Sequence, residues 1–353
     1  MAKTTRKIIA AIALIVTMSV LFCSCSTGDL LRLFGMEEID TYDPTTEMAA
    51  DILGKTVSQE NLQSGDFTYT VYSDGTASVT AYTGTSEKVE IPSQIDGHTV
   101  VALDNKALYD NDQIKELVLA DTVQVVGNSA AMYCANLEKV TFGKEIKHIG
   151  VSAFESEADD TNGVGGGSLK EIVFNGAPEI ICEKAFYYAD DLTEIVLPEG
   201  VKEIGPWAFA KCAGAERIII GDGLETMGDH AFHKCKGAKE VRIPGSCKTV
   251  EVSAFYQCIS LEKLTLEEGI ETLRKGAFEE CSALKTVTLP SSIKTMEPYI
   301  FYNCESLTEC YADSPETLEK DLFTGDDNVT IIAPAGSSLE TYASENDIAF
   351  QAK

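Results

Sequence analysis

Cysteine is the residue of this 353-residue chain whose type and spacing could support chemistry. Six cysteines share one position in a recurring phrase, such as AFAKC at 208–212 and AFHKC at 231–235, and these six are Cys134, Cys212, Cys235, Cys258, Cys281 and Cys304. Three more lie at other positions, namely Cys182, Cys247 and Cys310. No Cys-x-x-Cys pair occurs and no histidine falls at zinc-finger spacing. The sequence therefore predicts no metal site.

A second candidate is the stretch HAFHKC, in which His230, His233 and Cys235 stand close together. Such a group could form a Cys–His pair or bind a metal. However, His233 takes a position that we expect to be exposed, whereas Cys235 takes the repeated position that we expect to be buried. The side chains should therefore diverge.

Catalytic motifs of other kinds are missing from the sequence. It contains no Gly-x-Ser-x-Gly, no His-Glu-x-x-His and no phosphate-binding loop. Paired carboxylates are abundant, but in a chain with 56 acidic residues they identify no site without geometry. We predict that the chain is not an enzyme and uses no cofactor, and we keep an enzyme as the last of three alternatives.

The cysteine phrase returns because the chain repeats itself. The position three residues before the cysteine, which is Phe209 in AFAKC, can be followed through ten repeats. The residues at this position are Leu108, Ala131, Phe154, Phe186, Phe209, Phe232, Phe255, Phe278, Phe301 and Phe323. Most steps are 23 residues long. The step from Phe154 to Phe186 is 32, which is one repeat with nine extra residues, and the last step is one residue short. Self-similarity at a fixed period of this length is typical of solenoids.

One repeat, LTEIVLPEGVKEIGPWAFAKC at 192–212, shows how each unit should fold. Residues 195–197 alternate with the period of two that is typical of a strand with one buried face. Proline and glycine at 198–200 predict a turn, and 201–204 supply a second short apolar pair. Within 208–212, the alanine, phenylalanine and cysteine should lie on one side of a single helical turn.

Such a unit cannot bury its own apolar side, but it can do so when stacked on a copy of itself. Burial then stabilises each large side chain by roughly 2–3 kcal/mol. The sequence thus predicts a solenoid of mixed α/β class: a right-handed coil of 23-residue repeats with a parallel β-sheet and short helical turns. The repeated cysteines would be small buried hydrophobes. Disulfides between stacked coils are the alternative outside the cytoplasm, although nine cysteines cannot all pair.

The first 24 residues resemble a signal peptide. Lys3, Arg6 and Lys7 precede an apolar run over 8–22, which is too short for a comfortable membrane span. The small residue before Cys25 fits bacterial lipoprotein processing, which would remove residues 1–24 and attach lipid to Cys25. A plain secretory signal that is cut elsewhere is the alternative.

The rest of the chain divides by composition. Residues 25–65 are polar with few large apolar side chains, which predicts a disordered tether. Residues 66–87 alternate around Ser73-Asp74-Gly75 and predict a β-hairpin that caps the first coil. The repeats span 88–330. Residues 331–353 read as a strand, a turn and a short helix that cap the other end.

The net charge of −28 excludes one class of partner. With 56 acidic and 28 basic residues, the chain lacks the basic footprint that a phosphate backbone requires, so we predict no nucleic acid partner. A highly charged surface favours solubility and gives no information about the fold.

The consensus L-x-x-I-x-L-P-x-x-V-x-x-I-G-x-x-A-F-x-x-C resembles the BspA-like leucine-rich repeats of bacterial surface proteins. The resemblance covers residues 67–350, including the leading hairpin and the tail APAGSSLETYASEN. It implies a leucine-rich repeat solenoid and, for function, adhesion or the binding of host proteins. The first two repeats and the nine-residue insertion depart from the pattern.

Two sets of side chains are candidates for a binding surface. The outward residues at the strand centres include three consecutive apolar ones, and these are Val173, Val196 and Ile219. Exposed apolar strips mark some interfaces, although β-propensity alone also explains such residues. The position after the repeated phenylalanine includes Tyr187, Tyr256 and Tyr302. Half-exposed aromatic side chains suit binding, but they could equally cover the turn.

These observations predict a lipid-anchored extracellular protein on the outer side of a bacterial membrane. It would bind a protein or glycan of a host or neighbouring cell through many weak contacts along its repeat surface, as in adhesion. The alternative is a structural or spacer protein of the cell envelope without a dedicated ligand.

Overall fold

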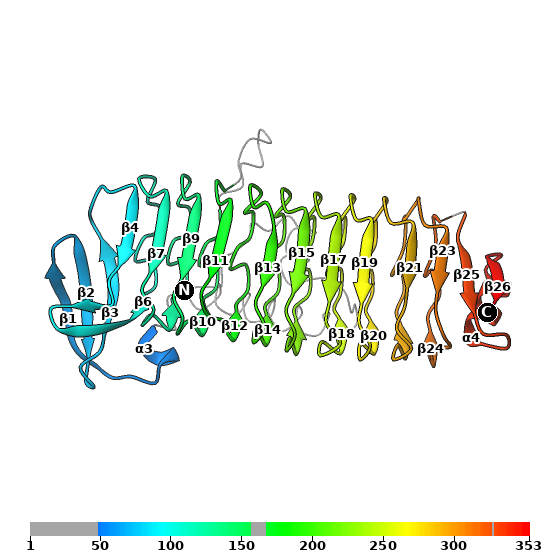
Figure 1. Cartoon of the computed structure of the whole chain (residues 1–353), viewed down its shortest axis with the longest axis horizontal. Coiled ribbons are helices and arrows are strands. Elements are labelled where there is room, and N and C mark those ends of the chain that lie inside the picture. Colours follow the sequence, from blue (N-terminus) through cyan, green and yellow to red (C-terminus); the bar gives the residue numbers. More distant parts are fainter. Residues whose placement is uncertain (1–48, 157–166, 327) are drawn as a thin grey trace, which may run out of the picture. The chain divides into compact units, whose positions relative to one another are not determined.

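The computed structural model describes residues 49–156, 167–326 and 328–353. The predicted signal peptide, Cys25 and most of the predicted tether lie outside these residues. In the described part, successive repeats form coils that stack side by side (Figure 1). The predicted leucine-rich repeat solenoid with parallel sheets is therefore confirmed.

Each coil from β7 to β24 contributes one longer strand and one two-residue strand, and the coils at the two ends contribute a longer strand. The longer strands are β4 (Lys88–Ile91), β7 (Glu116–Leu119), β9 (Lys139–Phe142), β11 (Glu171–Phe174), β13 (Ile195–Leu197), β15 (Arg217–Ile220), β17 (Glu240–Ile243), β19 (Lys263–Leu266), β21 (Thr286–Thr288), β23 (Glu309–Tyr311) and β25 (Thr330–Ala333). The short strands are β8 (Val125–Val126), β10 (His148–Ile149), β12 (Ile180–Ile181), β14 (Glu203–Ile204), β16 (Thr226–Met227), β18 (Thr249–Val250), β20 (Thr272–Leu273), β22 (Thr295–Met296) and β24 (Thr317–Leu318).

Strand pairing follows the sequence repeat. Ile195 pairs with Ile218, and Val241 pairs with Leu264, in parallel register one coil apart. The longer strands do not form one continuous sheet. They form the four-stranded sheets β4–β7–β9–β11 and β13–β15–β17–β19, and a third sheet with β21, β23 and β25. We call the side of the solenoid that carries them the long-strand face.

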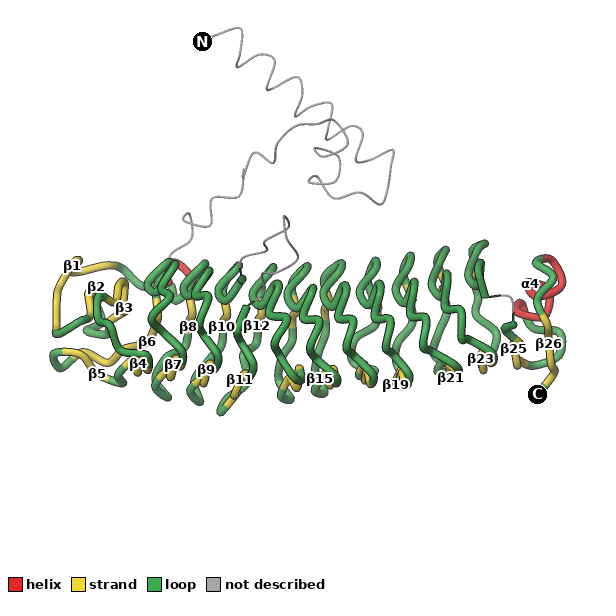
Figure 2. Tube along the Cα trace, turned by 90° about the horizontal axis from the view of Figure 1, so that it is seen from above, coloured by secondary structure: helices red, strands yellow, loops and turns green. Residues whose placement is uncertain are grey.

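The repeated phenylalanines fill the centre of the coils. From Phe186 to Phe301 each ring is fully buried and stacks on the next, with centroids 5.1–5.8 Å apart. Burial of this kind is the main stabilising term of the fold. Because each ring lies on the same ring of the neighbouring coil, the apolar side that one repeat cannot cover is covered by the next. The backbone trace shows these coils following one another in a single row (Figure 2).

The segment around each phenylalanine is not the helical turn that the sequence predicted. Trp207 and Lys211 have φ of 58° and 63°, which no right-handed helix contains. Alternate N–H groups donate to the following coil: Trp207 to the Asp229 carbonyl and Phe209 to the Ala231 carbonyl, at 3.1 and 2.8 Å. A helix would direct these groups along its own axis, so this turn is better suited to stacking. In the described residues, the helices are α3 (Ala49–Ile52) and α4 (Ser338–Glu345).

The N-terminal cap contains the predicted hairpin and more. Strands β2 (Phe67–Tyr72) and β3 (Ala77–Tyr82) pair antiparallel, and β3 pairs in parallel with β6 (His98–Leu103), which also pairs with the short β5 (Gln94–Ile95). A further strand, β1 (Val57–Ser64), pairs antiparallel with β2.

The prediction of a disordered tether over 25–65 is therefore wrong from Ala49 onward. Composition misled the prediction because β1 is held by backbone hydrogen bonds to β2, which do not depend on apolar side chains. In addition, α3 is anchored by the small side chains of Ala49 and Ala50, which are buried against β6 and its neighbours.

The C-terminal cap consists of α4 and β26 (Ala349–Ala352), which pairs in parallel with β25. The Ser337 hydroxyl accepts a hydrogen bond from the Glu340 N–H and so caps the helix N-terminus.

Among the described residues, none of the helices has the length and apolar character needed to cross a membrane.

Candidate functional site

The predicted apolar residues lie at the centres of three successive strands. Val173 is on β11, Val196 on β13 and Ile219 on β15, and Val196 pairs directly with Ile219. The exposed fraction of Val196 is 47%, and the other two side chains are half-buried. We call these three residues the apolar strip. Large apolar side chains with this degree of exposure are few in the described residues, where the others are Tyr109 and Ile259.

The apolar strip is surrounded by ion pairs that connect neighbouring coils. Glu171 contacts Lys139 at 2.8 Å, and Lys239 contacts Glu216 at 2.9 Å. Such exposed pairs contribute little stability individually and mainly fix the strand register. The long-strand face therefore offers a small apolar area within a charged frame.

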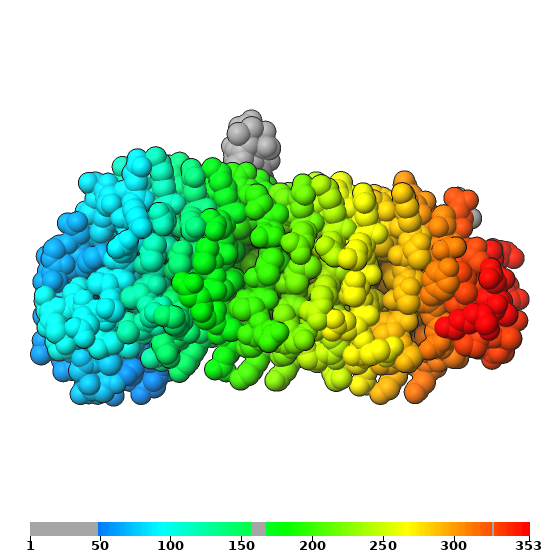
Figure 3. Space-filling model, viewed as in Figure 1, coloured from blue at the N-terminus to red at the C-terminus, as the bar shows by residue number. Residues whose placement is uncertain are grey.

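The strip also crosses a break in the sheet. β11 belongs to one four-stranded sheet and β13 to the next. Between them lies a cavity of about 120 Å³, which is lined by Lys170, Glu171, Ile172, Phe174, Thr193, Glu194, Ile195, Val196 and Leu197. The space-filling view shows the surface hollowed between the two strands (Figure 3). We call this cavity the β11–β13 slot.

The side chains beside the slot are more exposed than those at the equivalent positions of the preceding coil. Ile172 and Phe174 are half-buried, whereas Val140 and Phe142, their partners on β9, are fully buried. The Phe174 ring stacks on Phe142 with centroids 5.1 Å apart. The floor of the slot is therefore apolar, and its rim carries charged groups.

The predicted tyrosines do not form one surface. Tyr187 and Tyr256 are joined through a chain of rings that runs over Trp207 and His233, with successive centroids 6.4, 5.0 and 4.8 Å apart. Tyr302 instead contacts Tyr299, at 5.5 Å. All three predicted tyrosines are half-buried, which fits either a binding role or a role in covering the turns.

The expectation that His233 is exposed is wrong. Its exposed fraction is 9%, and Trp207 and Tyr256 pack against its ring. The His230 ring also lies against it, with centroids 5.2 Å apart, so aromatic rings from three successive coils cover His233. Burial, with nearby His230 and Lys234, lowers the pKa of His233 to about 3. The imidazole is therefore neutral near neutral pH.

The repeated cysteines point into the coils and serve as hydrogen-bond donors. The Cys235 thiol donates to the Phe209 carbonyl at 3.2 Å, and the Cys304 thiol donates to the Phe278 carbonyl at the same distance. Burial raises the pKa of the Cys258 thiol to about 12. The predicted burial of these residues is confirmed, and a thiol with a raised pKa is a poor nucleophile. The cysteines of the described residues are free thiols.

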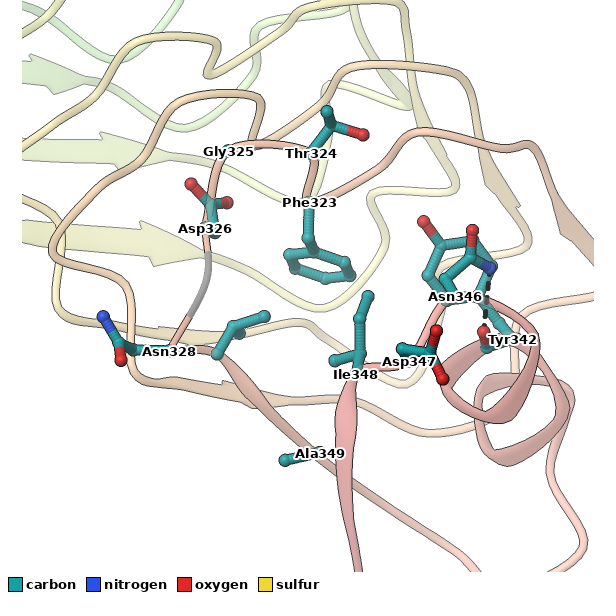
Figure 4. A pocket seen from close by; sticks show the side chains of 11 residues that line it. Phe323, Thr324, Gly325, Asp326, Asn328, Tyr342, Asn346, Asp347, Ile348 and Ala349 are labelled. Atoms are coloured by element: carbon teal, nitrogen blue, oxygen red, sulfur yellow. Dashed lines mark hydrogen bonds between the residues drawn. The ribbon is translucent and has the colours of Figure 1, made fainter.

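A second cavity lies at the C-terminal cap, with a volume of about 480 Å³ (Figure 4). Its lining includes the apolar side chains of Phe323 and Ile348, which lie near each other, and the carboxylates of Asp326 and Asp347. No histidine, cysteine or lysine is among the described residues that line it. In the same described part of the chain, no group of three or more potential ligands could hold a metal ion.

Sequence reasoning missed the slot and its rim. The signal was present, because Glu171 and Glu194 occupy the same position in successive repeats where the charges otherwise tend to alternate. The role of Trp207 was also missed. It is the one tryptophan of the chain, and its position carries different side chains in different repeats, from lysine to serine and glycine.

The stacked parallel coils and the buried phenylalanine column define a leucine-rich repeat solenoid. The comparisons with known proteins specify the class further. This chain belongs to the BspA-type leucine-rich repeat family, whose model matches residues 61–160, 165–282 and 248–345.

The chain is similar to several solved bacterial structures. A leucine-rich repeat protein of T. pallidum is 24% identical, with a TM-score of 0.46, over 64% of this chain and 91% of that one. A leucine-rich cell surface protein of Faecalibacterium prausnitzii is 17% identical, with a TM-score of 0.41, over 84% and 99%. The pneumococcal vaccine antigen PcpA is 15% identical, with a TM-score of 0.35, over 84% and 100%. No curated protein sequence matches this chain.

Proposed function

We propose that this protein is a lipid-anchored extracellular protein that binds a protein partner on a host or neighbouring cell. The observation that carries the proposal is the apolar strip, in which Val196 is 47% exposed at the centre of an otherwise charged face. Membership of the BspA-type family supports binding through the repeats, because leucine-rich repeats usually present an extended surface to protein partners.

The arrangement of the long-strand face suits a protein better than a small molecule. Interfaces between proteins have an apolar centre, from which water is excluded, and a polar rim. The strip supplies the centre, and the ion pairs on both sides supply the rim. Contact would extend over several coils, and each would contribute a small part of the binding energy.

The binding test compares the purified wild-type chain with one variant on arrays of surface proteins and glycans. The variant carries Val173→Thr, Val196→Thr and Ile219→Thr, which keep the β-branched shape and remove the apolar surface. Val118→Thr is the matched control, because Val118 holds the same position on β7 and is also half-buried. We expect the wild type and the control to bind the same protein and the triple variant to bind it at least about tenfold more weakly.

Two results would contradict this proposal. If the triple variant binds as well as the wild type, the strip is not the binding surface. If no protein binds, the spacer alternative is favoured, and binding to glycans alone would assign a different class of partner.

Lipid anchoring is tested separately, because Cys25 lies outside the described residues. The full chain is expressed in bacteria in the presence of a labelled fatty acid, next to a Cys25→Ser variant. Label on the wild type and not on the variant is expected. A wild-type chain that is secreted without label would support the plain secretory signal instead.

A further inference from the structure

The β11–β13 slot interrupts an ordered column of charges on the long-strand face. The column holds one residue from each coil, and these are Lys88, Glu116, Lys139, Glu171, Glu194, Arg217, Glu240 and Lys263. Within each four-stranded sheet the sign alternates. Glu240, for example, contacts both Arg217 and Lys263, and these two cations hold the pKa of its carboxyl below the ordinary value.

Alternation fails at the slot, where Glu171 and Glu194 follow each other. Each has a cation on its far side: Lys139 is 2.8 Å from Glu171, and Arg217 is 3.4 Å from Glu194. Both glutamates are among the residues that line the slot between the two coils. Like charges on neighbouring strands oppose pairing. Both side chains are slightly more than half exposed, at 55% and 54%.

The backbone is also open at this place. In the described residues, β11 and β13 are not paired as strands, although the Thr193 N–H donates to the Lys170 carbonyl at 3.4 Å. The half-buried side chains of Ile172 and Phe174 form part of the lining. A second break, between β19 and β21, differs in charge, because the column there continues from Lys263 to Thr286. The paired carboxylates therefore distinguish the first break.

We propose that the β11–β13 slot receives one arginine side chain of the partner protein. A guanidinium group between Glu171 and Glu194 would restore the alternation of charge, since the column would then run Lys, Glu, Arg, Glu, Arg. Its planar fork of donors can bridge two carboxylates. Its methylene stem would lie on the apolar floor beside Val196. This inference rests on the proposed function, because it specifies the partner that the apolar strip binds.

The size and composition of the slot favour arginine over a metal ion. A volume of about 120 Å³ is several times what one water molecule or a bare cation needs, so the slot has room for a larger group. A metal ion would also require several oxygen ligands and would gain nothing from Ile172 and Phe174. A lysine would satisfy one carboxylate at a time, since its ammonium is a single compact charge.

The test uses two pentapeptide probes, acetyl-Ser-Val-Arg-Val-Ser-amide and the same peptide with citrulline in place of arginine. Citrulline has nearly the same shape as arginine and no charge. Binding is followed by NMR on the full chain with labelled isoleucine and valine methyl groups. We expect saturable shifts at Ile172 and Val196 with the arginine peptide, and binding at least about tenfold weaker with citrulline.

The variant Glu171→Gln with Glu194→Gln should lose the preference for arginine over citrulline. The matched control is Glu116→Gln with Glu240→Gln, which removes the same charges from the same column inside intact sheets. This control should keep the preference. Methyl spectra of the unbound variants show whether each is folded, and Glu171→Asp with Glu194→Asp should retain at least part of the preference.

Three results would overturn the inference: no shift at the slot, equal binding of both peptides, or an unchanged preference in the glutamine variant. The glutamine variant also separates this inference from the proposed function. If it binds the array partner normally while the threonine variant of the strip does not, the slot inference fails and the proposed function stands. If the peptides behave as expected but the threonine variant of the strip binds its partner normally, the slot still binds arginine and the proposed function fails.

Discussion

The thiol of Cys235 donates a hydrogen bond to the carbonyl of Phe209, one coil earlier and 26 residues back in the sequence. The same bond recurs from Cys212 to Phe186, from Cys258 to Phe232 and at the later repeats. Each of these cysteines therefore fills space beside the phenylalanine column and also satisfies a buried carbonyl. The carbonyl would otherwise lose part of its hydrogen bonding on burial.

Replacement of this cysteine should separate the two roles. Cys235→Ala removes the donor and leaves a small void, so we expect a loss of about 1–2 kcal/mol in the free energy of unfolding. Cys235→Ser keeps a donor within reach of the Phe209 carbonyl and should cost less. Urea unfolding followed by Trp207 fluorescence measures both, and a serine variant less stable than the alanine variant would show that the hydrogen bond is unimportant.

The phenylalanine column predicts a gradient of stability between its middle and its end. Phe255 is fully buried between Phe232 and Phe278, whereas Phe323 has one phenylalanine neighbour, Phe301, and packs edge-on against Tyr342. Phe255→Ala should cost about 3–5 kcal/mol and Phe323→Ala less. Equal costs in urea unfolding would contradict the stacked arrangement.

Stacking with a period of 23 residues also predicts which deletions the fold tolerates. Removal of residues 236–258 takes out one whole repeat and joins Cys235 to Ile259, so every later residue keeps its position in the coil. We expect this variant to fold with native-like circular dichroism. Removal of residues 236–246 shifts all later coils by a fraction of a turn, and this variant should not fold cooperatively.

The His233 ring predicts a loss of stability in acid. Its pKa is lowered from 6.5 to about 3 in the folded state, mainly by burial, so the unfolded chain binds a proton more readily between these two values. The free energy of unfolding should therefore fall as the pH falls from about 6.5 towards 3. His233→Phe, which cannot titrate, should show a smaller fall over the same range. The measurement is urea unfolding at several pH values, and identical pH profiles would exclude His233 as a contributor.

The buried thiols predict a loss of stability in alkali as well. Burial raises the pKa of Cys258 from 9.0 to about 12, so the unfolded chain releases this proton first as the pH rises. Stability should be unaffected by this group below pH 9 and should fall from pH 9 towards 12. Cys258→Ala should reduce the slope in that range. A thiol reagent at pH 8 should label Cys258 only after unfolding, and rapid labelling of the folded protein would contradict its burial.

The sequence predicted the stacking of the coils because every repeat places apolar side chains at the same positions. It did not predict the turn around Phe209, since an alanine, an aromatic residue and a cysteine at these spacings fit one face of a helix equally well. The conformation of this turn depends on the hydrogen bond from the Phe209 N–H to the Ala231 carbonyl, and Ala231 is 22 residues away in the sequence.

The candidate site was predicted in part. Period-two alternation places Val196 on the outer surface of its strand, and the structure leaves it exposed. The break beside it arises from the relation between two strands, and no pattern within a single repeat reports such a relation. His233 was assigned to the surface by its position in the repeat, but Trp207 in the preceding repeat and Tyr256 in the following one cover its ring.

The most direct test of the central claim is photo-crosslinking from the apolar strip to the protein captured on the array. A photoreactive phenylalanine analogue at position 196 should crosslink to the partner. The same analogue at position 265, which holds the same place on β19 two coils beyond Ile219, should crosslink weakly. Equal crosslinking from both positions, or stronger crosslinking from position 302 among the turns, would contradict binding at the strip.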